Sequence, residues 1–137
     1  MSSQKPLELI LARNLLSSIS TPAFLVGEAG TLLFYNDAAA ALLGRRFEET
    51  GKLSATEWTA EFGPCDEDGR PIPYDEIPAT LALRGNRPFH GTFRIRQSGG
   101  ALREIEASAI PIVGRGGSAG GIVIFWPVLD GEGVETG

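Results

Sequence analysis

Hydrophobic and polar positions alternate between residues 89 and 96, as expected of a β-strand with one buried face. Two further apolar stretches follow at residues 102–112 and 122–128. Glycine-containing turns separate the three stretches, at residues 98–100 and 114–121. The last third of the chain is therefore predicted to form three antiparallel strands joined by two hairpins.

The first of these hairpins has a predicted register. If its turn is centred near Gly99, Phe93 faces Ile105 on the inner side of the sheet. In the same register Arg94 faces Glu104 on the outer side. A shift by one residue would lose both the apolar and the charged pair, so the side chains themselves specify the pairing.

The outer face of the second hairpin is more apolar than a solvated sheet should be. A turn centred near Gly116 pairs Val123 with Ala109 on the inner face. The opposite face then carries five large apolar side chains: Ile110, Ile112, Ile122, Ile124 and Trp126. This patch predicts a cover, either the N-terminal helix or a second copy of the protein.

Residues 6–20 are predicted to form that amphipathic helix. Spacings of three and four give it one apolar face, made of Leu7, Ile10, Leu11, Asn14, Leu15 and Ile19. Leu9 and Leu16 widen this face. A stripe this wide allows the helix to lie on its own domain, to join two subunits, or to do both.

The chain after this helix predicts a hairpin that leads into a second, shorter helix. Two apolar runs, residues 23–26 and 31–35, flank a turn that contains glycine. Asn36 or Asp37 can cap the alanine-rich segment that follows, and Gly44 suits the left-handed residue after its last turn.

The middle of the chain predicts two more helices with a loop between them. Residues 54–62 have helical apolar spacing, whereas residues 63–74 are rich in proline and glycine and indicate a loop. Residues 75–85 predict a helix again, with Asp75 as its expected cap and Gly85 at its end.

Three stretches of the sequence resemble PAS domains, a family of sensory and signalling modules. They are the hairpin and helix at residues 22–44, the segment DEDGRPIPYDEIPATLALRG, and the final hairpin SAIPIVGRGGSAGGIVIFW. The resemblance covers residues 22–128 and implies an α+β PAS fold. In that fold short helices cross one face of a five-stranded antiparallel sheet and enclose a small pocket.

The expected organisation is a flanking helix, one domain and a tail. The amphipathic helix occupies residues 1–21, the PAS domain residues 22–129, and a flexible C-terminal tail residues 130–137. A length of 137 residues suits a single domain. The sequence ends without an output domain, so the output is expected in another chain or in a larger protein of which this is a fragment.

Composition narrows the possible partners and compartments. The net charge of -5 and the lack of clustered basic residues argue against nucleic acid and membrane surfaces as partners. One cysteine cannot form an internal disulfide, and no run of about 18 apolar residues could span a bilayer. A cytoplasmic location is therefore expected.

The potentially reactive residues do not match the cofactor-binding patterns of the family. Haem-binding PAS domains carry a histidine on the pocket helix, whereas His90 is predicted on the outer face of a strand. Flavin photosensors carry cysteine in an Asn-Cys-Arg-Phe context on a helix, whereas Cys65 lies in a loop. Haem and flavin are thus disfavoured.

Metal binding and catalysis are not indicated either. The Asp66 to Gly69 turn lacks the remaining ligands of a calcium loop. No metal and no catalytic residue is predicted. An enzyme on a PAS-like scaffold, with Cys65 as its reactive group, is the least favoured alternative.

A pocket between the sheet and the helix at residues 75–85 remains plausible, because small residues interrupt the large ones on the inner sheet face. Its candidate ligand contacts are Tyr35, Asn36, Thr80, Leu81, Arg84, Phe93, Ile105 and Phe125. The competing interpretation is that phenylalanine and leucine side chains simply fill the interior.

The leading functional hypothesis is a signalling module of a bacterial signal transduction system that acts by protein contact, as a homodimer that addresses an output domain or partner protein. Its candidate interface is Leu7, Ile10, Leu11, Leu15, Ile112, Ile122, Ile124 and Trp126. The alternative is a sensor that binds an unidentified small molecule in the pocket.

Overall fold

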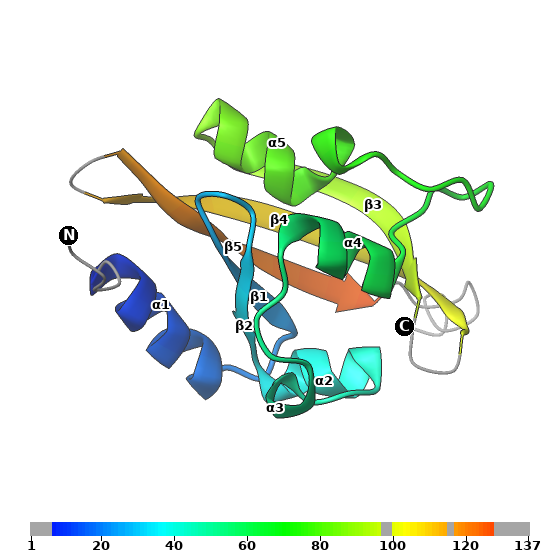
Figure 1. The fold of residues 1–137 in the computed structure, drawn as a ribbon, viewed down its shortest axis with the longest axis horizontal. Helices are drawn as coiled ribbons and strands as arrows, with labels where there is room; N and C mark the ends of the chain where they lie inside the picture. Colours follow the sequence, from blue (N-terminus) through cyan, green and yellow to red (C-terminus); the bar gives the residue numbers. More distant parts are fainter. Residues whose placement is uncertain (1–6, 97–99, 115–116, 128–137) are drawn as a thin grey trace, which may run out of the picture.

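A computed structural model describes residues 7–96, 100–114 and 117–127. Its centre is one five-stranded antiparallel sheet in the order β2-β1-β5-β4-β3 (Figure 1). The strands are β1 Ala23–Gly27, β2 Leu32–Tyr35, β3 Phe89–Arg96, β4 Leu102–Gly114 and β5 Gly117–Pro127. The α+β class and the strand number expected from the sequence are confirmed.

Helices lie on both faces of this sheet. They are α1 Leu7–Ser18, α2 Asp37–Leu43, α3 Phe47–Thr50, α4 Ala55–Phe62 and α5 Pro78–Gly85, with a 3-10 turn, η1, at Tyr74–Glu76. Alternate residues of β1 separate the two layers: Phe24 and Val26 belong to the core beneath α4 and α5. Ala23 and Leu25 instead pack with α1. In the described parts of the chain, no helix combines the length and apolarity needed to cross a bilayer.

Both predicted hairpin registers are confirmed. Phe93 pairs with Ile105, and Arg94 pairs with Glu104. In the second hairpin Val123 faces its expected partner across the ladder between β4 and β5. The two turn centres, at residues 97–99 and 115–116, lie outside the described residues.

Asn36 is the cap of α2 and also holds α1, the loop after α1 and β1 to this helix. Its Oδ1 accepts hydrogen bonds from the backbone N–H groups of Ala39, at 3.0 Å, and Ala23, at 3.1 Å. Its Nδ2 donates to the carbonyl oxygens of Leu16 and Thr21. The side chain is therefore fully used in joining α1, β1 and α2, and it is buried.

α1 packs on the sheet through a narrower face than the sequence pattern indicated. Leu9, Ala12 and Leu16 are buried against the outer sheet face, at the helical spacing of three and four residues. These three residues form a narrow strip with the small Ala12 at its middle. The main predicted stripe faces solvent instead, with exposed fractions of 64% at Leu7, 44% at Ile10, 57% at Leu11 and 57% at Leu15.

The start of α5 differs from the prediction. Ile77 occupies the cap position without a side-chain hydrogen bond, and Pro78 takes the first turn. Asp75 lies in η1 and does not cap the helix; its Oδ1 is 3.1 Å from Nη2 of Arg84. Helix α3 was not predicted at all, because its four residues are too few to show a helical period.

Each edge of the sheet is met by a short bridge from a loop. On β2, Leu32 pairs antiparallel with Leu53. On β3, Arg94 exchanges two backbone hydrogen bonds with Cys65, at 2.8 and 2.9 Å. These bridges interrupt the unpaired strand edges and fix two loops against the domain.

Candidate functional site

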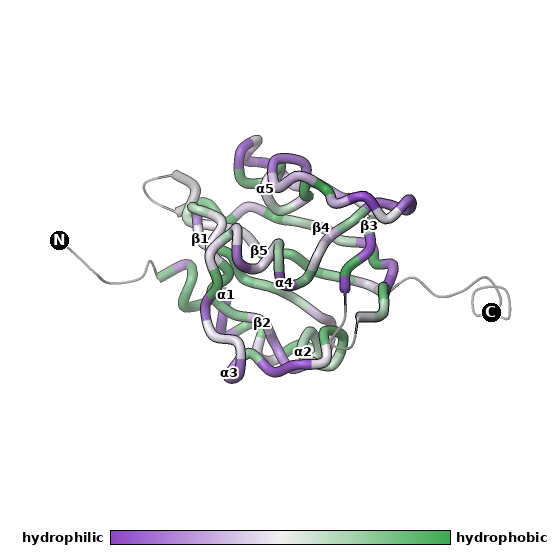
Figure 2. The backbone as a smooth tube through the Cα atoms, turned by 45° about the vertical axis from the view of Figure 1, so that its right-hand side comes forward, coloured by the Kyte–Doolittle hydropathy of each residue, from purple (hydrophilic) through white to green (hydrophobic). Residues whose placement is uncertain are grey.

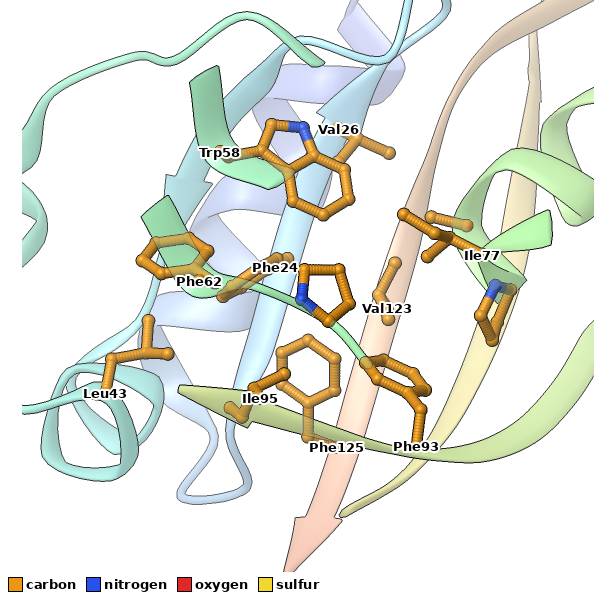
Figure 3. A pocket seen from close by; sticks show the side chains of 13 residues that line it. Phe24, Val26, Leu43, Trp58, Phe62, Ile77, Phe93, Ile95, Val123 and Phe125 are labelled. Carbon is orange, nitrogen blue, oxygen red and sulfur yellow. The ribbon is translucent and has the colours of Figure 1, made fainter. Parts of the chain in front are cut away.

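A small cavity lies between the inner sheet face and helices α4 and α5 (Figure 3). Its volume is about 20 Å³. The residues around it share one property, apolar side chains: Phe24, Val26, Leu43, Trp58, Phe62, Pro64, Ile77, Pro78, Ala79, Phe93, Ile95, Val123 and Phe125. The site is therefore suited to hydrocarbon rather than to charge.

Aromatic rings set the shape of this cavity. Phe24 contacts Phe125 edge to face, with ring centroids 4.7 Å apart, and lies 5.7 Å from Phe62. The indole of Trp58 meets Phe24 at nearly a right angle, and its Nε1 donates a 2.8 Å hydrogen bond to the Gly30 carbonyl oxygen. Because the indole is held at its polar end, its apolar part forms a fixed wall.

The cavity is far too small for the cofactors found in some members of the PAS family. A volume of about 20 Å³ is close to the minimum that holds one water molecule. A haem or a flavin ring would require the surrounding side chains to move apart, and the apolar wall offers no group to ligate iron. The residues present do not fit either group.

Thr80 is the exception to the apolar character of this region. It lies on α5 directly after the cavity residue Ala79, does not itself line the cavity, and is 2% exposed. Its Oγ1 is buried and has no hydrogen-bond partner among the described residues. A buried hydroxyl without a partner carries a desolvation cost, so this oxygen is a group that a bound molecule could satisfy.

Only part of the predicted ligand set surrounds the cavity. Phe93 and Phe125 line it, as Figure 3 shows. Ile105 is fully buried in the same core but does not line the cavity. Leu81 is half-buried and Arg84 is exposed in its ion pair with Asp75, so neither reaches the cavity wall.

Tyr35 and Asn36 serve the backbone instead. The Tyr35 hydroxyl donates to the Arg45 carbonyl oxygen, at 2.9 Å, and lies 3.1 Å from Oγ1 of Thr50. Burial raises the pKa of the Tyr35 phenol above its ordinary value of 10.0, and the hydrogen bond with Thr50 opposes part of that shift. Asn36 is occupied by the contacts that join α1, β1 and α2.

Sequence reasoning missed the cavity wall supplied by α4 and the loop after it. Trp58 and Phe62 are four residues apart, and this spacing correctly predicted a packed helix. The position of that helix over β1 depends on long-range packing, which the local pattern does not encode. Pro64 and Ile77 carried no distinguishing signal.

A second candidate site is an exposed apolar surface on the other side of the sheet. We call it the outer-face surface and define it by the α1 residues Leu7, Ile10, Leu11 and Leu15 and the strand residues Ile110 and Trp126. Figure 2 shows hydrophobic segments along α1 as well as along the strands. Ile110 and Trp126 are 40% and 42% exposed. Ile112, Ile122 and Ile124 are half-buried and pack against the cluster that includes α1.

Cys65 and His90, the two potentially reactive side chains, have separate surroundings. Cys65 is buried in the loop bridged to Arg94. His90 is exposed on β3, and its Nδ1 lies 2.8 Å from Oγ of Ser108 on the neighbouring strand. The described residues also contain no group of three or more histidine, cysteine or acidic side chains placed to hold a metal ion.

No family model and no curated protein matches this sequence. The structure, by contrast, is similar to several solved PAS domains. The PAS domain of the HTR-like protein from Haloarcula marismortui has a TM-score of 0.61 at 15% identity, covering 87% of this chain and 90% of that one. The PAS domain of Bordetella pertussis BvgS also has a TM-score of 0.61, at 17% identity, over 94% and 92%.

A solved LOV protein also has a similar structure. The Rhodobacter sphaeroides LOV protein has a TM-score of 0.71 at 13% identity, covering 89% of this chain and 68% of that one. These identities are low, so they bear on the fold alone. Strand order, helix placement and similarity over most of the chain agree: this protein has the fold of a PAS domain.

Proposed function

We propose that this protein is a sensory signalling module that acts by protein contact, as a homodimer formed through the outer-face surface. Structural neighbours that belong to sensors, among them a PAS domain from a two-component sensor histidine kinase, support the signalling role. The output domain or partner protein addressed by the dimer belongs to the same signal transduction system.

The observation that carries this proposal is the exposed stripe of α1. Leu7, Leu11 and Leu15 are each more than half exposed, although three other residues already anchor the helix to the sheet. Large apolar side chains gathered on one surface mark contact sites, and their burial stabilises association by roughly 25 cal/mol per Å². A two-fold axis beside α1 would place the stripe of one protomer against the same stripe of its partner.

Measurement of the mass in solution tests the homodimer. The wild-type protein should sediment at twice the 14.5 kDa chain mass, whereas Leu11→Glu should shift the equilibrium toward the monomer. Ala41→Glu is the matched control, because Ala41 is exposed on α2, outside this surface, and receives the same charge. A wild-type protein that stays monomeric at about 100 μM, far above a micromolar dissociation constant, would refute the proposal.

Small-molecule sensing is the second candidate, and Thr80 supports it. Thr80 does not line the cavity, but its buried, unpartnered Oγ1 follows the cavity residue Ala79 on α5 and suits a mainly apolar ligand with one hydrogen-bonding group. Such a ligand would enlarge the cavity by moving α5 away from the sheet.

Native mass spectrometry of protein purified from its own host, compared with the denatured mass, decides between the candidates. Added mass supports the sensor, and an unmodified dimer supports the contact module.

A further inference from the structure

A groove on the surface of the domain lies on the far side of α4 from the internal cavity. It is bounded by the outward side of α4, by the loop at residues 63–72 and by the end of β3, and its volume is about 320 Å³. This volume falls within the range of small-molecule sites. The two spaces share Pro64 as a wall, while Trp58 and Phe62 face only the cavity.

The groove has an apolar floor with one cation at its end. Ala60, Pro71, Ile72 and Tyr74 supply apolar surface. The Arg96 guanidinium supplies the charge: its Nε and Nη2 lie 3.1 Å from the point where a Cβ on Gly63 would stand. A side chain at residue 63 would therefore displace the guanidinium from the groove.

Arg96 has no acidic partner among the described residues, although carboxylates border the groove on two elements. Three of those carboxylates have other partners, whereas Glu67 and Asp68 are exposed in the loop. On α4, Glu57 accepts from the Ser54 N–H and Glu61 pairs with Arg45. In the loop, the Asp66 carboxylate accepts from two backbone N–H groups of its own turn. Among the described residues, therefore, none pairs with the guanidinium, which is available to an anion from outside.

The groove is held in shape by backbone hydrogen bonds. The loop is fixed to β3 by the bridge between Cys65 and Arg94, and the Ile72 N–H donates to the Pro64 carbonyl oxygen at 3.0 Å. The Tyr74 ring lies 6.3 Å from the Trp58 ring, in an edge-to-face contact. A molecule in the groove would touch Pro64, which also lines the internal cavity, and Tyr74, whose ring contacts the cavity residue Trp58.

We propose that this groove binds a small organic carboxylate with an apolar body. The planar fork of a guanidinium matches a carboxylate, and the apolar floor accepts an aromatic or aliphatic group of the same molecule. The site is separate from both the internal cavity and the outer-face surface, and the inference does not depend on the proposed homodimer.

Amide chemical-shift titration with phenylacetate tests this inference, with phenylacetamide as its uncharged counterpart. Phenylacetate should give saturable shifts at Ala60, Gly63 and Arg96, and the amide should bind at least about fivefold more weakly, because charged hydrogen bonds exceed neutral ones. Arg96→Gln should weaken phenylacetate by a similar factor, whereas Arg87→Gln, a change to an exposed arginine outside the groove, should not.

A second variant keeps the charge and changes the shape. Ala60→Leu should narrow the groove and weaken binding while α4 stays folded, since leucine is a good helix former. The inference is overturned if phenylacetate causes no saturable shifts up to about 10 mM, if the amide binds equally well, or if the shifts surround Phe24 and Val123 instead. The last result would place the ligand in the internal cavity. The mass of the same samples reports separately on the homodimer.

Discussion

Asn36 has the densest set of hydrogen bonds of any single side chain described above, and replacing it should be costly. Asn36→Ala would leave two N–H groups and two carbonyl oxygens without their partner, in or near the core. We expect a loss of about 2–4 kcal/mol in the free energy of unfolding, measured by urea denaturation. Asn14→Ala, on the exposed side of α1, is the control. Equal midpoints for the two variants would contradict this role.

Phe93 and Phe89 allow a similar comparison on one strand. Phe93 is 7% exposed and lines the cavity, whereas Phe89 is 40% exposed. Phe93→Ala should reduce the free energy of unfolding by roughly 3–5 kcal/mol, and Phe89→Ala by much less. Thermal or chemical denaturation measures both. If Phe93→Ala left the midpoint near the wild-type value, Phe93 would not be a core residue.

Tyr35 predicts a limit to stability at alkaline pH. Because burial raises its pKa above 10.0 in the folded state, the unfolded chain loses this proton first as the pH rises. The stability due to Tyr35 is therefore complete below pH 10 and declines as the pH rises through the folded-state pKa. Tyr35→Phe should show a shallower decline above about pH 10 in denaturation experiments. An identical slope in both proteins would show that Tyr35 does not ionise on unfolding in that range.

At the scale of the element, replacing neighbouring leucines on α1 should affect different properties of the protein. Leu16 is 1% exposed against the sheet, and Leu15 is 57% exposed in the outer-face surface. Leu16→Ala should cost about 2–5 kcal/mol and speed amide hydrogen exchange along α1. Leu15→Ala should leave that exchange unchanged in the monomer and weaken the dimer. Faster exchange in Leu15→Ala alone would mean that the two faces have been assigned the wrong way round.

The sequence predicted the strands better than the helices, for a physical reason. Strand side chains alternate with a period of two, so one apolar pair and one charged pair sufficed to set the register between Phe93 and Ile105. The apolar stripe of α1 was too wide to show which part of it faces the sheet. That choice depends on the shape of the sheet surface as well as on the helix, and the buried strip is Leu9, Ala12 and Leu16.

The candidate site was predicted less well than the fold, because its walls come from segments distant in sequence. Polar residues such as Asn36 and Tyr35 were plausible ligand contacts by residue type, yet both serve backbone groups. Thr80 was predicted as a polar ligand contact on the pocket helix; it is buried there but does not line the cavity, and its lack of a partner among the described residues could be found only in three dimensions.

At the scale of the molecule, charge and apolar contact act against each other in the proposed dimer. Each protomer has a net charge of -5, so two protomers repel one another at low ionic strength. The outer-face surface, in contrast, consists of apolar side chains. Raising the salt from about 0.05 to 0.5 M should therefore leave dimerisation unchanged or strengthen it severalfold, as measured by sedimentation. A tenfold weakening would indicate an interface of ion pairs instead.

The bridges at the two sheet edges favour this kind of assembly over its main alternative. Leu53 and Cys65 occupy positions where another strand would begin to pair with β2 or β3. Face-to-face contact about a two-fold axis closes after two copies, whereas edge-to-edge addition can continue without limit. In the proposed dimer, the bridged edges therefore favour a finite face-to-face complex over open-ended strand addition.

The two ends of α1 are attached to the domain by different kinds of contact. Its carboxyl end is tied to the domain through the Leu16 carbonyl oxygen and Asn36, whereas Leu9, near the amino end, is held by apolar contact over Gly120. Hydrogen bonds are directional and apolar contacts are not, so a sideways load on α1 would swing its amino end while the carboxyl end stays in place. A partner that binds the first turn would apply its force about one helix length from the attached end, roughly 18 Å at 1.5 Å per residue.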